Sequence, residues 1–451
     1  MKTENHFTNK QDNFSPGGSS LEKDFRKLIN DKRFHDFAIK CSDGKTVYGC
    51  KAILATRSDV FDKYIFNKST ESKNNYSFKD INSSAMKVIL EFLYTSKVES
   101  LTFNNVIEVY YASIHFKLIE LQDHTIEFTK SLVNGDVDIG RKLLSECVEK
   151  FTLKVDNKIS HILVDWVAKN KLEKDINDSL SLEGLRYLLE KTYNTKIPFA
   201  TPEFNIWEYS LTKAIRKVMK KETLVKEILN KNSFSICNPQ QIEELNLCLT
   251  PLISYIDLNR MNAKEIKQQV APFNIYSDKK ISDVYYSKAL NEELEFIRGA
   301  PIFKWKNNGM SKLFNVPNNG FTVTALIQES VLGDLIFKGK GVYEWNILIE
   351  KLNNKVYIGI CDINVSLNKN DQGYHGWVLG SDGYVYHEKK WKWYDAKFKE
   401  GDKVTIHLNM KNGTCAFFVN NIRKPTVSEW NIPSQVSPIV SLGYGSKLRI
   451  E

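Results

Sequence analysis

The spacing of apolar residues changes near residue 300, and this change limits the folds open to the chain. From about residue 103 to residue 290, apolar side chains recur every three to four residues, which is typical of one face of an α-helix. Beyond residue 300 they alternate with polar neighbours, as at Tyr343, Trp345, Ile347 and Ile349. Two periods in separate blocks predict a helical array followed by a β-sandwich.

The stretch 404–419 carries the clearest hairpin signal in the second block. Asn412-Gly413 is a preferred pair for a two-residue type I′ turn. Such a turn would place Met410 opposite Cys415 and would direct the apolar side chains of both strands to one face. We therefore expect a hairpin in the sandwich with this register.

The first 130 residues show a third, mixed pattern. Residues 1–18 are polar and are expected to form a disordered leader. Short alternating segments around 37–48 predict a hairpin, and short amphipathic helices follow it. A further helix should begin near residue 19, with one apolar face made by Leu21, Phe25, Leu28 and Ile29.

Composition argues against several functional classes. The net charge of +9 is spread thinly along the chain, whereas nucleic-acid binding requires a concentrated basic surface. No apolar run is long enough to span a membrane, and the N-terminus lacks the apolar core of a secretion signal. The seven cysteines form no C-x-x-C pair, which is typical of reduced thiols in a cytoplasmic or nuclear protein. No phosphate loop, zinc helix or nucleophile elbow is present, so we predict no catalytic residue, no metal site and no cofactor.

Three segments of the first 130 residues resemble the BTB/POZ family. They are 36–40 (DFAIK), 49–58 (GCKAILATRS) and 89–98 (ILEFLYTSKV), and their order and spacing agree with that family over about 100 residues. Cys50 departs from the pattern, because histidine is usual there.

Two further families are suggested by later segments. Residues 180–185 (LSLEGL) and 203–208 (EFNIWE) resemble a BACK domain. The last 150 residues resemble a SPRY domain, and the matching pieces are 341–345 (GVYEW), 357–360 (YIGI), 381–384 (SDGY), 401–402 (GD) and 417–420 (FFVN).

These resemblances imply a multidomain α+β protein. Its parts would be a disordered leader (1–18), a BTB α/β module (19–130), an all-α BACK helical array (131–295) and an all-β SPRY sandwich (300–451). BTB domains self-associate and many bind a cullin scaffold, while SPRY domains bind proteins through loops at one end of the sandwich. The resemblance therefore implies a non-catalytic, homodimeric adaptor that recruits an unknown protein or peptide to a cullin-RING ubiquitin ligase. From its cysteines we expect this protein in the cytoplasm or in the nucleus.

The resemblance also implies contact residues in the BTB part. The apolar face of the first helix (Leu21, Phe25, Leu28, Ile29) packs either on its own domain or across a dimer interface. Cullin-binding relatives carry a hydrophobic residue two positions before a glutamate, which correspond here to Ser69 and Glu71. Because Ser69 is not hydrophobic, Ile65 or Phe66 would have to supply the anchor. Glu71 would otherwise be a solvated loop charge.

For the SPRY part, ligand contacts are expected on loops and exposed aromatics. The candidates are Tyr374, Trp377, Trp391 and Trp393. Trp391 and Trp393 are two residues apart and therefore share a strand face. For each tryptophan, a place in the sandwich core is the alternative.

Three other functions remain open at this point. A dimeric scaffold without a ligase role is favoured by the serine at position 69. A BTB zinc-finger transcription regulator would need zinc-ligand spacing that the sequence lacks. An enzyme would need an unrecognised site in the SPRY-like part.

Overall fold

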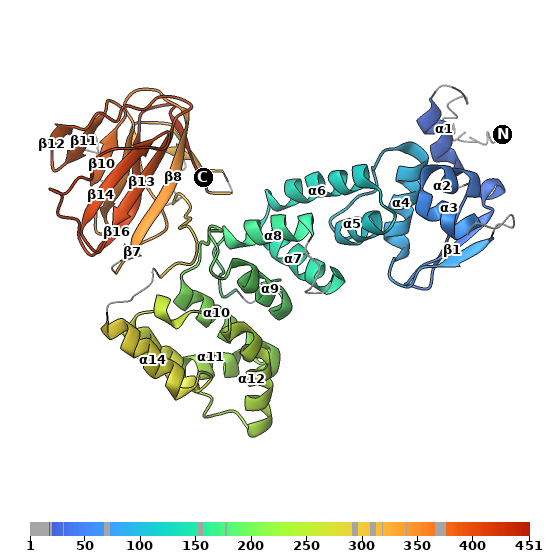
Figure 1. The fold of residues 1–451 in the computed structure, drawn as a ribbon, viewed down its shortest axis with the longest axis horizontal. Coiled ribbons are helices and arrows are strands. Elements are labelled where there is room, and N and C mark those ends of the chain that lie inside the picture. The colour runs from blue at the N-terminus through green and yellow to red at the C-terminus, as the bar shows by residue number, and fades with distance from the viewer. Residues whose placement is uncertain are drawn as a thin grey trace, which may run out of the picture. The chain divides into compact units, whose positions relative to one another are not determined.

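The computed structural model describes residues 18–451 except 19, 30, 67–72, 152–156, 176–177, 291–295, 307–312, 318, 340 and 366–375. Its internal contacts divide the chain into two units, Met1–Leu132 and Val133–Glu451. The first unit combines helices with a small sheet, and the second contains a helical block followed by strands (Figure 1). The predicted multidomain α+β class is confirmed.

The first unit is built around a three-stranded sheet of order β2-β1-β3, with β2 antiparallel and β3 parallel to β1. Its elements are α1 (Leu21–Leu28), η1 (Lys32–Phe34), β1 (Phe37–Lys40), β2 (Thr46–Gly49), α2 (Lys51–Arg57), α3 (Asp59–Phe66), β3 (Asn75–Ser77), α4 (Ser83–Thr95), α5 (Val106–His115) and α6 (Ile119–Val133), whose last residue falls in the second unit.

Helix α4 lies at the centre of this unit and packs against α1, α2 and α5. Asn82 caps its start by accepting a hydrogen bond from the Ala85 N–H at 2.9 Å. Its side chains are buried along nearly its whole length, so it forms the core rather than an amphipathic surface. Phe61 stacks on Phe116 nearby, with ring centroids 4.5 Å apart.

The second unit begins with helices, as the period of about 3.6 residues predicts. They are α7 (Val137–Phe151), α8 (Lys158–Ala168), α9 (Leu182–Thr192), α10 (Glu203–Met219), α11 (Glu222–Lys231), α12 (Pro239–Ile253), η2 (Leu258–Arg260), α13 (Ala263–Glu265), η3 (Ile266–Val270), η4 (Ala271–Phe273) and α14 (Asp278–Ala289). Between residues 103 and 290 the described part of the chain contains no strand, which confirms the predicted helical array.

Two antiparallel sheets follow and enclose one core. One has the order β12-β11-β10-β9-β16-β6 with β7 also on β16, and the other has the order β15-β14-β13-β8-β17-β5-β4. The strands are β4 (Phe314–Asn315), β5 (Thr322–Ala325), β6 (Glu329–Leu332), β7 (Phe337–Lys338), β8 (Val342–Lys351), β9 (Tyr357–Asp362), β10 (Trp377–Gly380), β11 (Tyr384–His387), β12 (Lys390–Trp393), β13 (Lys403–Asn409), β14 (Thr414–Val419), β15 (Ile422–Arg423), β16 (Gln435–Leu442) and β17 (Lys447–Ile450).

The alternation predicted for β8 is confirmed, because Tyr343, Trp345, Ile347 and Ile349 are all buried. These side chains fill the space between the two sheets. The apolar side chains on the inward faces of the strands therefore hold the two sheets together.

The hairpin of β13 and β14 exists, but its predicted register is wrong by two residues. Leu408, not Met410, lies opposite Cys415, and the last pair before the loop is Asn409 with Thr414. The loop therefore has four residues, and only Gly413 (φ +60°) adopts the left-handed conformation that a type I′ turn requires at both positions. Because the shift is an even number of residues, the apolar side chains keep the predicted face.

Residues 296–303 attach the sandwich to the helices. The Phe199 N–H donates to the Ala300 carbonyl at 2.9 Å, and the Glu203 N–H donates to the Phe296 carbonyl at 2.8 Å. Gly299 (φ +65°) approaches the Ile197 carbonyl so closely that an added Cβ would lie 1.9 Å from its oxygen. The domain boundary placed between residues 295 and 300 stays a prediction.

Candidate protein-interaction surfaces

Helix α3 carries two of the residues expected at a cullin contact. Ile65 is fully buried in the core of the first unit, whereas Phe66 is 37% exposed. Ser69 and Glu71 lie outside the described residues. A buried core side chain is not available to a partner, so Phe66 is the apolar side chain that α3 offers there.

Helix α1 carries the residues expected at a dimer interface. Phe25, Leu28 and Ile29 pack partly on the core of their own unit, while Leu21 is 75% exposed. Ser20 caps the helix by accepting a hydrogen bond from the Lys23 N–H at 3.4 Å. The same helix face therefore serves its own unit and leaves one leucine at the surface.

A buried carboxylate ties α1 to its unit. Glu91 on α4 accepts from Arg26 of α1 at 2.7 Å and from the N–H of Ser100 at 3.1 Å. It also accepts from the Ser100 hydroxyl and the Glu99 N–H. Burial alone would raise the pKa of Glu91, but these hydrogen bonds outweigh it and lower the pKa below its ordinary value. Glu91 therefore fixes the position of α1 as an ionised group.

Trp377, one of the four ligand candidates in the sandwich, belongs to the core. It is 7% exposed and lies between the two sheets. Its ring stacks on His387, with centroids 4.6 Å apart. Tyr374 lies outside the described residues. Trp377 therefore occupies the core position that was the alternative to ligand binding for each tryptophan.

Trp391 and Trp393 lie on the surface, 68% and 48% exposed. Both belong to β12, the last strand of its sheet, and they lie opposite Tyr386 and Tyr384 on β11. Their shared face, predicted from the two-residue spacing, is confirmed by this register. Trp393 meets the Tyr384 ring edge to face at 4.9 Å. Together they form an exposed aromatic edge.

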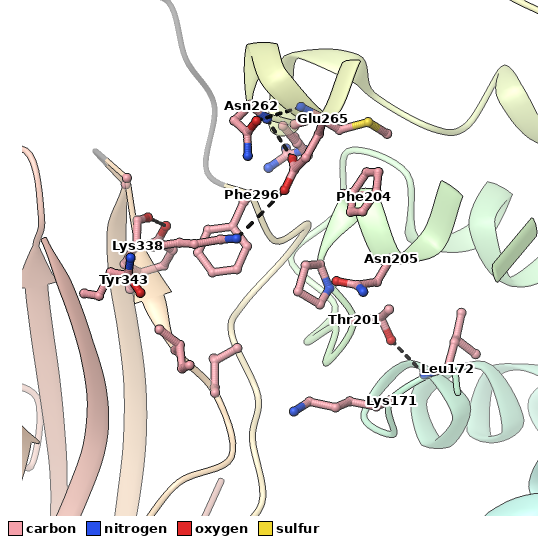
Figure 2. A pocket seen from close by; sticks show the side chains of 18 of the residues that line it. Lys171, Leu172, Thr201, Phe204, Asn205, Asn262, Glu265, Phe296, Lys338 and Tyr343 are labelled. Atoms are coloured by element: carbon pink, nitrogen blue, oxygen red, sulfur yellow. Dashed lines mark hydrogen bonds and ion pairs between the residues drawn. The ribbon is translucent and has the colours of Figure 1, made fainter. Parts of the chain in front are cut away.

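A pocket of about 820 Å³ lies within the second unit, where the helices meet the sandwich (Figure 2). Helical segments supply Leu172, Phe204 and Met261, and the sandwich side supplies Phe296 and Tyr343. Its size is in the range of small-molecule sites.

Two ion pairs lie among the residues that line this pocket. Lys338 approaches Glu265 at 3.8 Å (Figure 2). Lys171 pairs with Asp334 at 2.9 Å. Sequence reasoning did not find this pocket, because its walls come from segments more than 150 residues apart and no local motif marks them.

Three buried cysteines, Cys41, Cys147 and Cys361, are not activated nucleophiles. Burial raises the pKa of Cys41 to about 11 and that of Cys147 and Cys361 to about 12, so these thiols stay protonated at neutral pH.

Within the described ranges, no three His, Cys, Asp or Glu side chains gather as a metal site would require. No helix in the same part of the chain has the length and hydropathy to cross a bilayer.

Comparisons with known proteins agree with this geometry. Residues 25–132 match the BTB/POZ domain family, and residues 341–451 match the SPRY domain family. The helical region lies between them, as in a BTB–BACK–SPRY architecture. Both matched domains are protein-interaction domains, which indicates an interaction adaptor and is consistent with a non-enzyme.

Solved structures that match part of this chain include two SPRY domains. The SPRY domain of human HERC1 shares 22% identity, with 30% of this chain and 91% of that chain covered and a TM-score of 0.27. The PSpry domain of TRIM65 shares 13% identity, with 33% of this chain and 91% of that chain covered and a TM-score of 0.28. No curated protein matches the chain.

Proposed function

We propose that this BTB/POZ- and SPRY-containing chain is a substrate adaptor of a cullin-RING ubiquitin ligase. The BTB part would form the homodimer and bind the cullin, the BACK-like helices would space the modules, and the SPRY part would capture a target protein. The observation that carries the proposal is the presence of both interaction domains in one chain, with a helical region between them.

A dimer would present two capture domains to the same target. Tethering two binding sites raises the effective concentration of the second without adding a contact, provided that both sites can be reached. The dimer could then hold its target firmly even if each SPRY domain alone binds it weakly.

Phe66 is our candidate for the cullin anchor. The serine at position 69 removes the usual hydrophobic side chain, a loss of about 1–3 kcal/mol by burial. Phe66 is exposed at the end of α3, and this supports its taking the place of the missing hydrophobic side chain at position 69.

Co-elution of the full chain with the N-terminal half of the cullin, with mass measured by light scattering, tests this proposal. A 2:2 complex is expected, and Phe66→Arg and Glu71→Arg should each weaken it without dissociating the dimer. Lys87→Glu, an exposed charge change on α4, serves as the control. A dimer that ignores the cullin at tens of micromolar would contradict the ligase role.

Such a result would favour a second function, a dimeric BTB/SPRY scaffold without ubiquitination. The serine at position 69 is the specific observation in its favour. We place either form in the cytoplasm, and also in the nucleus, because all seven cysteines are free thiols, which suits a reducing compartment.

A further inference from the structure

Among the described residues, no strand pairs with the outer side of β12, which lies at the end of its sheet. Strand β12 pairs with β11 through a tight turn in which His387 lies opposite Lys390, and the Tyr394 N–H donates to the Gly383 carbonyl at 3.0 Å. Hydrogen-bonded and non-hydrogen-bonded pairs alternate along antiparallel strands. The N–H and C=O groups of Trp391 and Trp393 therefore point away from β11.

The side chains of this strand are sorted by face. Trp391 and Trp393 lie with Tyr384 and Tyr386 on the outer face of the sheet. Lys390 and Lys392 lie on the opposite face, and Lys392 pairs with Glu429 at 2.8 Å in an exposed ion pair. All four residues of β12 are exposed. An added strand would therefore meet aromatic rings on one face and ammonium groups on the other.

A second copy of this chain does not fit this edge well. If two β12 strands paired with the same face upward, lysines would lie opposite lysines, which is unfavourable. Lysines on an exposed edge are a common means of preventing such self-pairing. The turn adds Glu388 and Lys389, which are both exposed and offset each other in charge. The basic character of the edge therefore comes from Lys390 and Lys392, and it favours an acidic partner.

We propose that the outer edge of β12 binds an extended segment of a partner protein in which acidic and apolar residues alternate. The segment adds a strand to the sheet, its apolar side chains contact Trp391 and Trp393, and its carboxylates face Lys390 and Lys392. This inference rests on the proposed function, since it names the kind of segment that the sandwich captures.

A fluorescein-labelled peptide of about ten alternating Glu and Val residues, titrated against the full chain by fluorescence anisotropy, is the direct test. We expect binding that weakens with salt, and no comparable binding of an alternating Lys and Val peptide. In hydrogen exchange of the wild-type chain, the acidic peptide should slow the amides of Trp391 and Trp393.

Two substitutions at one position separate the backbone from the side chain. Trp391→Ala and Trp391→Pro both remove the indole, but only proline removes the outward N–H, which an edge strand tolerates. Trp391→Pro should bind at least about tenfold more weakly than Trp391→Ala, a difference of about 1.4 kcal/mol. Lys390→Glu should also weaken binding, whereas Lys411→Glu, the same charge change in the β13–β14 loop, should not.

Equal binding by the alanine and proline variants, with no amide protection, would overturn strand addition. Equal binding of the basic peptide would overturn the choice of an acidic partner. Failure of the acidic peptide to bind would overturn the proposal as a whole, and intact co-elution with the cullin would show that the adaptor function is not at fault.

Discussion

Two buried carboxylates, Glu91 and Glu203, each hold together segments that are distant in sequence. Glu91 joins α1 and residues 99–100 to α4. Glu203 is fully buried and receives two hydrogen bonds from Arg298, which is 3% exposed. An ionised group out of water is stable only while its partners remain. Removing a partner of Glu91 or Glu203 should therefore lower the free energy of unfolding strongly.

Glu91→Gln should lower the free energy of unfolding of the first unit by about 2 kcal/mol at neutral pH, because it weakens hydrogen bonds to a charged group. The folded-state pKa of Glu91 lies below its ordinary value of 4.5, so its stabilisation is present above that pH and is lost as the pH falls through the folded pKa. The difference between wild type and variant in urea unfolding should therefore shrink below pH 4.5. Glu127→Gln, at an exposed ion pair, is the control, and a pH-independent difference would contradict this role.

Arg298→Met should lower the free energy of unfolding of the second unit by about 3–5 kcal/mol, because it removes the ion-pair partner of the buried Glu203 and leaves only the Asp257 N–H as its donor among the described residues. Combining it with Glu203→Leu should restore part of the loss, since no buried charge then remains. Arg449→Met, at a pair that is about half exposed, should change the free energy by less than about 1 kcal/mol. Urea unfolding checks all three, and equal losses at Arg298 and Arg449 would argue against a buried ion pair.

The short β11–β12 hairpin shows how an element is set by its turn. Glu388 (φ +48°) and Lys389 (φ +64°) both adopt the left-handed conformation, as a type I′ turn requires. Neither residue type favours that conformation, so the hairpin forms against local preference. Its neighbours on β10 and β11 must hold it in place.

Replacing Glu388-Lys389 by Asn-Gly should raise the free energy of unfolding by about 1 kcal/mol, because those residues accept positive φ more readily. Lys390→Gly, at a position where the backbone is extended, should instead lower the free energy of unfolding by about 0.5–1 kcal/mol. Thermal unfolding of the full chain measures both. A destabilising Asn-Gly turn would mean that the two residues do not have left-handed backbones.

The whole molecule has two units, and each sheet-bearing region has a hydrophobic core of its own. Units with separate cores unfold in separate transitions, because the loss of one core does not expose the other. This division bears on the proposed function, since target capture and cullin binding would be assigned to different units.

Met86→Ala and Ile347→Ala each remove a fully buried side chain, one from each unit. Each should destabilise its own unit by about 2–5 kcal/mol through the lost burial and the cavity left behind. Scanning calorimetry of the full chain should show Met86→Ala shifting one transition and Ile347→Ala shifting another. A single transition that moves with both substitutions would contradict two independent units.

The spacing of apolar residues correctly predicted the order of helical and β-rich blocks and the faces of individual strands. The buried row on β8 and the shared face of Trp391 and Trp393 follow from the two-residue period alone, because successive side chains point to opposite sides. Periodicity is a local property, so it is readable without knowing what the element packs against.

Which side chains of a face are covered depends on the packing of distant segments and could not be predicted from the sequence. Ile65 is buried and Phe66 exposed, and Trp377 is a core residue while Trp391 is on the surface, although their types gave no reason for the difference. The register of the β13–β14 hairpin and the pocket lined by Leu172 and Tyr343 depended likewise on the rest of the fold. Burial and register are set by partners far away in the chain, and those partners leave no trace in the local pattern.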